Sequence, residues 1–332
     1  MIAAGEPIFG LGTALPWLYP PTFLLIILPL ALLPYFVALS LWTLIGLAGY
    51  LWVVRRLAPH PLTYWLALAF PGTYQNLVFG QNGFLFAVLL GGGLLFLEGS
   101  PLTAGVLLGL LSCKPHLMVL VVLALVVGRY WRALLSAVLV SAILIAASVL
   151  VLKPEVWLAF LKSTPESVRV LQTGLLPWRN VPLHLFNMPT VFCAMLEAGA
   201  GPGTARILQG AVMLGVAVVV GCAWFRGAAL TIRGSILVLG ILLFTPYAAV
   251  YDLALLALPL ACLSWDGYTR GWLPGEPLLL VLGWLMPLLA PYLALATHVQ
   301  IAPVVLILLV ILVLRRWLKY PDMTKDRASF FS

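Results

Sequence analysis

Residues 22–54 read TFLLIILPLALLPYFVALSLWTLIGLAGYLWVV and hold no charged residue. A helix needs about 20 apolar residues to cross the hydrocarbon core of a bilayer, so this run is too long for one crossing. Pro29 and Pro34 interrupt it, and proline ends or kinks a helix. We therefore expect a short interfacial or re-entrant helix at 22–33, followed by a spanning helix that ends at Arg55-Arg56.

The rest of the 332-residue chain has the same character. Its residues are 63% hydrophobic and 8% charged, with a mean hydropathy of +1.12, whereas about 25% of the residues in a soluble domain are charged. The 25 prolines and 29 glycines are compatible with membrane helices, because neighbouring helices satisfy the backbone groups that a break frees. The sequence predicts an all-α polytopic membrane protein.

Apolar runs follow one another along the chain and predict about ten spanning helices, with short re-entrant or interfacial helices beside them. After the first span we expect further ones at about 62–79, 83–97, 101–113, 116–128, 132–152, 205–226, 232–246, 251–265, 276–292 and 299–318. Residues 153–204 are the longest polar region, which we interpret as an outer loop with a partly buried helix. We expect one transmembrane domain over 1–318 and a cytoplasmic tail at 319–332.

The basic residues predict the orientation of these spans. With the N-terminus outside, 12 of the 18 lysines and arginines fall on the inner side, as the excess of basic residues in cytoplasmic loops requires. The net charge of +8 is then a topological signal, and we expect no nucleic-acid partner. The loop 153–204 and the hairpin ends near Gln81 and Lys114 would share the outer side.

Motifs for soluble-type catalysis are absent from the sequence. The four cysteines (Cys113, Cys193, Cys222 and Cys262) lie in apolar stretches without a CxxC pair, so we interpret them as buried small hydrophobic residues. There is no Asp-rich or His-rich cluster, no Walker loop, no GxSxG and no dinucleotide-binding motif. We expect no metal and no cofactor, and the pattern argues against an ATPase or a soluble-type hydrolase.

The stretch Ser112-Cys113-Lys114-Pro115-His116 places two ionisable residues at a break between two apolar runs. Charged side chains in membrane segments are costly, which makes them candidates for function. Lys114 and His116 could bind an anion such as a lipid phosphate, next to the positive N-terminal end of the following helix. The alternative is a lysine that extends toward the interface.

Two further motifs fall on the same predicted side. The adjacent amides of Gln81 and Asn82 could bind sugar hydroxyls, or Asn82 could cap the next helix. Tyr19-Pro20-Pro21 prevents the chain from being helical before the first apolar run. These three residues could shape a lipid-facing cleft or form a structural turn.

An acidic residue and two residues of the outer loop complete the candidates. Asp252, beside Tyr251, could orient a sugar, act as a general base, or pair with a base such as Lys114 or Arg179. Trp178 and Arg179 in the outer loop could stack on a sugar and bind a phosphate, although aromatic residues also anchor proteins at membrane interfaces.

Several short motifs follow one another in a fixed order. They are Gly5-Glu6-Pro7-Ile8, Tyr19-Pro20-Pro21, the Pro29/Pro34 run with Trp42, Gly80-Gln81-Asn82, the Gly105/Gly109 helix leading to Lys114-Pro115, the Arg129–Arg132 cluster, and Tyr251-Asp252-Leu253 with Pro259. In order and spacing they resemble glycosyltransferase family 87. The similarity covers most of the chain and is densest in residues 5–132.

The resemblance implies a GT-C-type membrane enzyme. Such enzymes transfer a sugar, often mannose, from a polyprenyl-phosphate donor to a lipid or glycan acceptor on the outer face, usually with inversion. An acidic residue deprotonates the acceptor hydroxyl, and basic groups stabilise the leaving phosphate. Lys114 matches the family lysine, for which the resemblance implies the phosphate role. We expect a multi-pass protein of the bacterial inner membrane.

One departure from the family concerns the catalytic aspartate. Members usually begin with a spanning helix and an outer loop that bears this aspartate, and the present chain starts inside that loop. We therefore expect the first helix and the aspartate to be missing, which leaves Asp252 as a candidate acid. Glu6 does not fall at the family position.

Three hypotheses follow for the activity. The first is the glycosyltransferase, with Lys114, His116 and Arg179 on the donor phosphate and Gln81, Asn82, Trp178, Tyr251 and Asp252 on the sugar or acceptor. The second is a lipid or sugar transporter or flippase, because broken helices also occur there. Transport needs a polar path near the midplane, whereas the charges here gather at one side, which favours the enzyme. The third is an inactive, truncated remnant of the enzyme.

Overall fold

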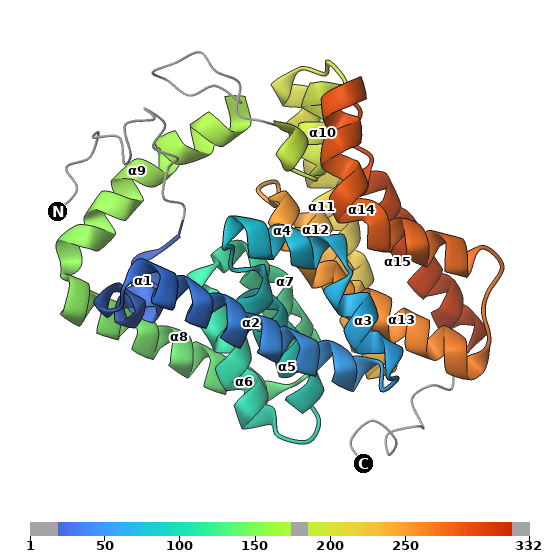
Figure 1. Ribbon diagram of the computed structural model, residues 1–332, viewed down its shortest axis with the longest axis horizontal. Coiled ribbons are helices and arrows are strands. Elements are labelled where there is room, and N and C mark those ends of the chain that lie inside the picture. Colours follow the sequence, from blue (N-terminus) through green and yellow to red (C-terminus); the bar gives the residue numbers. More distant parts are fainter. Residues whose placement is uncertain (1–18, 174–184, 321–332) are drawn as a thin grey trace.

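A computed structural model of the chain describes residues 19–173 and 185–320 (Figure 1), and these residues form helices without strands. In chain order the helices are α1 (Pro21–Ile27), α2 (Tyr35–Leu57), α3 (Leu62–Leu68), α4 (Pro71–Phe79), α5 (Gly83–Phe96), α6 (Pro101–Leu110), α7 (Pro115–Val127), α8 (Trp131–Leu152), α9 (Pro154–Thr173), α10 (Val191–Glu197), α11 (Pro202–Phe225), α12 (Leu230–Phe244), α13 (Ala257–Arg270), α14 (Glu276–Thr297) and α15 (Ala302–Lys319). Short 3-10 segments are η2 (Leu28–Leu32), η3 (Leu111–Cys113), η4 (Leu185–Asn187) and η5 (Val250–Leu256).

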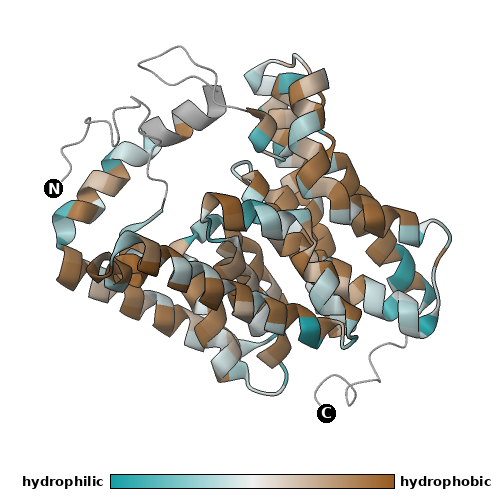
Figure 2. Ribbon diagram, in the orientation of Figure 1, coloured by the Kyte–Doolittle hydropathy of each residue, from teal (hydrophilic) through white to brown (hydrophobic). Residues whose placement is uncertain are grey.

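The helices confirm an all-α polytopic membrane protein. Five helical segments of the described chain are long and apolar enough to cross a membrane, namely α2, α8, α11, α14 and the continuous segment Val250–Arg270. Five further apolar segments have 10–17 residues, and together with the five long ones they agree with a polytopic membrane protein. Figure 2 shows the helices hydrophobic over most of their length.

Prolines explain the shorter segments. Pro101 and Pro115 stand at the first helical position of α6 and α7, where a proline is tolerated but the chain before it cannot continue as a helix. The helix expected at 22–33 is present as α1 followed by η2, and the span after it is α2. The apolar runs and prolines therefore predict where these helices begin and end.

The prediction of one span over 62–79 is wrong. Phe70, which precedes Pro71, has the extended angles φ −62° and ψ 125°, because a residue before proline is disfavoured in the α region. The chain consequently breaks into α3 and α4. The Thr73 hydroxyl donates to the Ala67 carbonyl at 2.7 Å, and the Trp284 indole donates to the Leu66 carbonyl at 3.1 Å. These donors satisfy carbonyls that the break leaves without helical partners.

The polar region 153–204 contains two helices. Figure 1 shows α9 extending from the end of α8 toward α10. The Trp157 indole donates to the Ser148 hydroxyl at 3.0 Å, which fixes the corner between α8 and α9. Trp178 and Arg179 lie outside the described residues.

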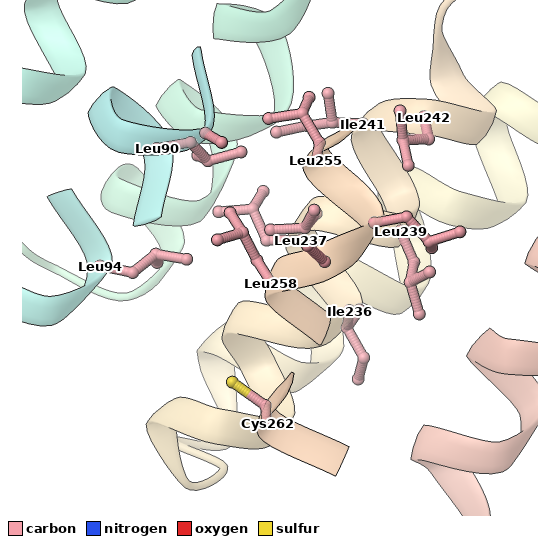
Figure 3. Close-up of a cluster of buried hydrophobic side chains, with 14 of the residues drawn as sticks. Leu90, Leu94, Ile236, Leu237, Leu239, Ile241, Leu242, Leu255, Leu258 and Cys262 are labelled. Atoms are coloured by element: carbon pink, nitrogen blue, oxygen red, sulfur yellow. The ribbon is translucent and has the colours of Figure 1, made fainter. Parts of the chain in front are cut away.

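The core is built where α5 packs against α12 and the segment formed by η5 and α13. Figure 3 shows Leu90 and Leu94 of α5 directed toward Leu255 and Leu258, and all four side chains are buried. A side chain at Gly91 would come within 3.0 Å of Leu258. Contacts this close hold the segment formed by η5 and α13 against α5.

Helices α6 and α8 approach each other through small residues. A Cβ at Gly105 would clash with the Ala133 carbonyl oxygen, and one at Gly109 would lie 2.7 Å from the Ala137 carbonyl oxygen. Small residues four apart on both helices allow this contact, as is common between membrane helices. The Ser141 hydroxyl adds a hydrogen bond to the Gly109 carbonyl at 3.2 Å. The close contact fixes the helix that leads to Lys114.

Candidate functional site

An ion pair between Lys114 and Asp252 lies in the interior of the molecule. Lys114 sits between η3 and α7, with the non-helical angles φ −137° and ψ 74°, since Pro115 begins the next helix. Its ammonium group pairs with one carboxylate oxygen of Asp252, and only 5% and 2% of the two side chains are exposed. The other carboxylate oxygen accepts a hydrogen bond from the Ala249 backbone amide at 3.1 Å.

Three aromatic rings surround the lysine ammonium. Its nitrogen is 4.9 Å from the ring centre of Phe86, 5.2 Å from that of Tyr251 and 5.8 Å from that of Tyr19. The hydroxyls of Tyr19 and Tyr251 are 3.3 Å apart, within hydrogen-bond distance. A cation is attracted to the negative face of an aromatic ring. The site is therefore suited to hold a positive charge where water is excluded.

The turn between α4 and α5 is fixed to η5 by Asn76. The side-chain amide of Asn76 donates to the Tyr251 carbonyl and to the Gly72 carbonyl, each at 2.9 Å. Its carbonyl oxygen accepts from the Gly83 amide at 2.8 Å, which is the first free amide of α5. Gly80 ends α4 in the left-handed conformation with φ 58°, where a glycine is favoured.

Asn82 does not act as the helix cap that the sequence offered as one interpretation. It occupies the N-cap position of α5, but its side chain makes no capping hydrogen bond, and Asn76 instead accepts from the first amide of the helix, that of Gly83. Asn82 is 5% exposed, and its side-chain oxygen has no partner among the described residues. The buried Nε2 of His116 and the buried hydroxyl of Ser112 are likewise without partners there.

The structure brings together four of the residues singled out from the sequence, namely Tyr19, Lys114, Tyr251 and Asp252. Pro20 and Pro21 are the N-cap and the first residue of α1, so they fix the start of the helix directly after Tyr19. Gln81 is half-buried in the α4–α5 turn. Trp178 and Arg179 cannot be related to the pair because they lie outside the described residues.

Two residues at the site escaped the sequence interpretation. Phe86 gives no signal, because it is one apolar residue in an apolar helix. Asn76 could have been noticed as one of the two adjacent amides, Gln75 and Asn76, in the segment before Gly80. Its role in joining two distant segments depends on the tertiary fold.

The arrangement is suited to binding an anion. A phosphate that reaches Lys114 would replace or join the Asp252 carboxylate, and the N-terminal amides of α7 would lie next to it. Asp252 is less suited to accept a proton in this state, since Lys114 and Ala249 engage both of its oxygens. Within the described ranges, no three His, Cys, Asp or Glu residues are grouped so as to hold a metal ion.

Comparison with known proteins gives one match. The sequence model of glycosyltransferase family 87 matches residues 17–246, more than half of the chain. No curated protein and no solved structure matches the chain.

Proposed function

The chain belongs to glycosyltransferase family 87 and is a membrane glycosyltransferase, and from this premise we propose its substrates and the role of Lys114. The donor is a hexose such as mannose linked to a polyprenyl phosphate. The acceptor is a lipid or a glycan on the outer face of a bacterial inner membrane. The observation that carries this proposal is the buried ammonium of Lys114 at the break before α7.

Lys114 binds the phosphate of the donor. In the reaction, the acceptor hydroxyl oxygen forms a bond to C1 of the sugar while the bond between C1 and the phosphate oxygen breaks. The polyprenyl phosphate leaves with the electron pair, and the hydroxyl proton passes to a base. The ammonium stabilises the negative charge that grows on the leaving phosphate, and it does so strongly because water is excluded.

Asp252 positions Lys114. Without donor, the carboxylate neutralises the ammonium, which a membrane protein cannot leave unpaired in its interior without a large cost. With donor, the phosphate provides the negative charge, and Asp252 keeps the ammonium directed toward it. This role agrees with the engagement of both Asp252 oxygens and assigns the proton transfer to another group.

The sugar and the acceptor bind at the α4–α5 turn beside the pair. The buried, unpartnered side-chain oxygen of Asn82 offers an acceptor for a sugar hydroxyl, and Gln81 is its neighbour. His116 adds a ring nitrogen near the phosphate. We further propose that Trp178 and Arg179 contribute from the outer loop, as the sequence indicates.

A transfer assay tests the proposal. The purified chain in liposomes is incubated with radiolabelled polyprenyl-phosphate hexoses and lipid extracts as acceptors. We expect Lys114→Ala to lower kcat by about 100-fold or more, as removal of a group that stabilises developing charge does, and Lys114→Arg to retain part of the rate. Wild-type rates for a folded Lys114→Ala protein would contradict the role of Lys114.

The same liposomes separate the competing hypotheses. Movement of the labelled lipid across the bilayer without formation of a glycosidic bond would favour a transporter or flippase. A folded wild-type protein that neither transfers nor moves any hexose of the panel would favour an inactive protein.

A further inference from the structure

A second polar site lies at the opposite end of α7 from Lys114. It is a pocket of about 740 Å³ between the α5–α6 turn and the α7–α8 turn. Its lining includes Glu98, Arg129, Tyr130, Trp131 and Arg132. Helix α7 has 13 residues, so a rise of 1.5 Å per residue separates the two sites by roughly 20 Å. The pocket is thus independent of the site around Lys114.

Among the described residues of the pocket lining there is one acidic side chain, that of Glu98, and it is already neutralised. The Glu98 carboxylate accepts from the guanidinium of Arg233 at 2.6 Å, and Arg233 is only 6% exposed. The same guanidinium donates to the Tyr130 hydroxyl at 2.6 Å and lies over the Trp224 ring. The charge of Glu98 is therefore balanced from inside the protein.

The charges of the two arginines of the pocket are not balanced by an acidic partner among the described residues. Arg129 and Arg132 are exposed, and neither side chain has a hydrogen-bond or ion-pair partner in the part of the chain that the structure describes. The lining consequently carries an excess of positive charge. Its natural ligand is an anion.

The pocket lies at the boundary of a membrane helix. Trp131 is the first residue of α8, a helix long and apolar enough to cross a membrane, and 53% of Trp131 is exposed. Exposed tryptophans of this kind lie at the level of the lipid headgroups. Next to the pocket, Leu102 of α6 and Leu135 and Leu139 of α8 are more than 60% exposed, which provides an apolar surface for acyl chains.

We propose that this pocket binds the phosphate of an anionic phospholipid, with Arg129 and Arg132 on the headgroup and the acyl chains on the exposed faces of α6 and α8. The lipid lies in the leaflet next to the helix ends at which the basic residues gather. The distribution of lysine and arginine predicts that this leaflet is the inner one. Anionic lipids attract basic residues near the membrane surface. This proposal does not depend on the substrates of the enzyme.

Lipid retention by matched variants tests the proposal. The wild-type chain, Arg129→Gln/Arg132→Gln and Arg55→Gln/Arg56→Gln are purified from mixed micelles of phosphatidylglycerol and phosphatidylcholine, and bound lipid is measured by native mass spectrometry. The second pair removes the same charge at the end of α2, where both guanidiniums lie over aromatic rings.

We expect the wild-type chain to retain phosphatidylglycerol over phosphatidylcholine. The Arg129/Arg132 variant should lose about tenfold or more of that retention, because each charged hydrogen bond to the headgroup that is lost weakens binding by about tenfold or more, whereas the Arg55/Arg56 variant, which loses no such bond, should stay within about twofold of the wild type. Equal losses in the two variants, or no loss at Arg129 and Arg132, would overturn the proposal.

A competition arm separates a lipid from a soluble phosphate. Inorganic phosphate and glycerol phosphate, added in excess over the lipid, should leave phosphatidylglycerol bound, because the acyl chains contribute to its binding. Displacement by either soluble anion at concentrations comparable to the lipid would assign the pocket to a soluble ligand and contradict the proposal. Arg129→Lys/Arg132→Lys, which keeps the charge, should retain most of the lipid if the variants are folded.

Discussion

Lys114 and Asp252 are separated by 138 residues in the chain, yet their side chains form an ion pair of which only 5% and 2% is exposed. A buried ion pair contributes little net stability, because the cost of desolvating two charges offsets their attraction. Removing one partner is different, since it leaves the other charge buried and uncompensated. Stability and activity should therefore respond differently when one or both residues are replaced.

The single variants Lys114→Met and Asp252→Leu should each lower the free energy of unfolding by about 3–5 kcal/mol. The double variant Lys114→Met/Asp252→Leu should recover most of this loss, because two apolar side chains of similar volume need no compensation. Thermal unfolding of the purified proteins in detergent measures all four members of the cycle.

The double variant then serves as the folded control for activity. It should unfold near the wild-type temperature and still lose at least about 100-fold in sugar transfer. A double variant that transfers sugar at the wild-type rate would remove Lys114 from the mechanism. One that is as unstable as the single variants would instead make the pair a structural requirement of the fold.

Gly83 is a second position at which the site constrains the sequence. A Cβ on this residue would lie 2.5 Å from the Asn76 side-chain oxygen and 2.7 Å from the Tyr251 carbonyl oxygen. Gly83→Ala should therefore push η5 away from α5, lower the stability by about 1–3 kcal/mol and impair transfer. Gly215→Ala on α11, where no atom lies within 4 Å of the added carbon, is the matched control and should be neutral or slightly stabilising.

Sugar transfer and thermal unfolding of both glycine variants are measured side by side. Equal transfer rates and equal unfolding temperatures for the two variants would mean that the contact between Gly83 and Asn76 has no role in holding η5 at the site.

The sequence predicted the helical membrane class correctly, because apolar runs and prolines act locally. Pro29 lies at the start of η2 and Pro34 separates η2 from α2, and the lysine of the Lys114-Pro115 break lies outside regular helix. The run 62–79 was misread, since a single Pro71 outweighed the apolar character around it.

Only the polar residues of the site could be predicted from the sequence. A charged residue in an apolar run is conspicuous, so Lys114 and Asp252 could be named, and their pairing was one of several possibilities. The pairing itself depends on how α5 holds η5, through contacts such as that between Asn76 and Tyr251. Phe86 faces the lysine, yet it resembles every other apolar residue of its helix.

A half-buried glutamine, Gln75, compensates for a proline in α14. Pro291 has no amide hydrogen, so the carbonyl of Pro287, four residues earlier, loses its helical donor. The side-chain amide of Gln75, from α4, donates to this carbonyl. Gln75→Met should cost about 1 kcal/mol in the wild type and clearly less in a Pro291→Ala background, where the alanine would restore a helical amide.

A double-mutant cycle by thermal unfolding measures this coupling between Gln75 and Pro291. Additive effects of the two substitutions would show that the hydrogen bond does not compensate for the proline.

Arg316 and its neighbour Arg315 offer the sharpest test of how the end of the bundle is held. Arg316 is fully buried; its guanidinium pairs with Asp266 and Glu276, and donates to the Gly271 carbonyl at 2.9 Å. A lysine has the charge but not the planar fork of donors, so it cannot reach three partners at once. Arg316→Lys should lower the stability by about 2–3 kcal/mol.

The adjacent Arg315→Lys is the control, because among the described residues Arg315 makes only long hydrogen bonds of 3.4 Å to the exposed Pro274 carbonyl. This exposed substitution should stay within about 0.5 kcal/mol of the wild type. The two variants are chemically identical and one residue apart, so thermal unfolding compares burial and geometry alone. Equal thermal stability of the two variants would mean that the charge of Arg316, and not the planar fork of donors on its guanidinium, holds α13, α14 and α15 together.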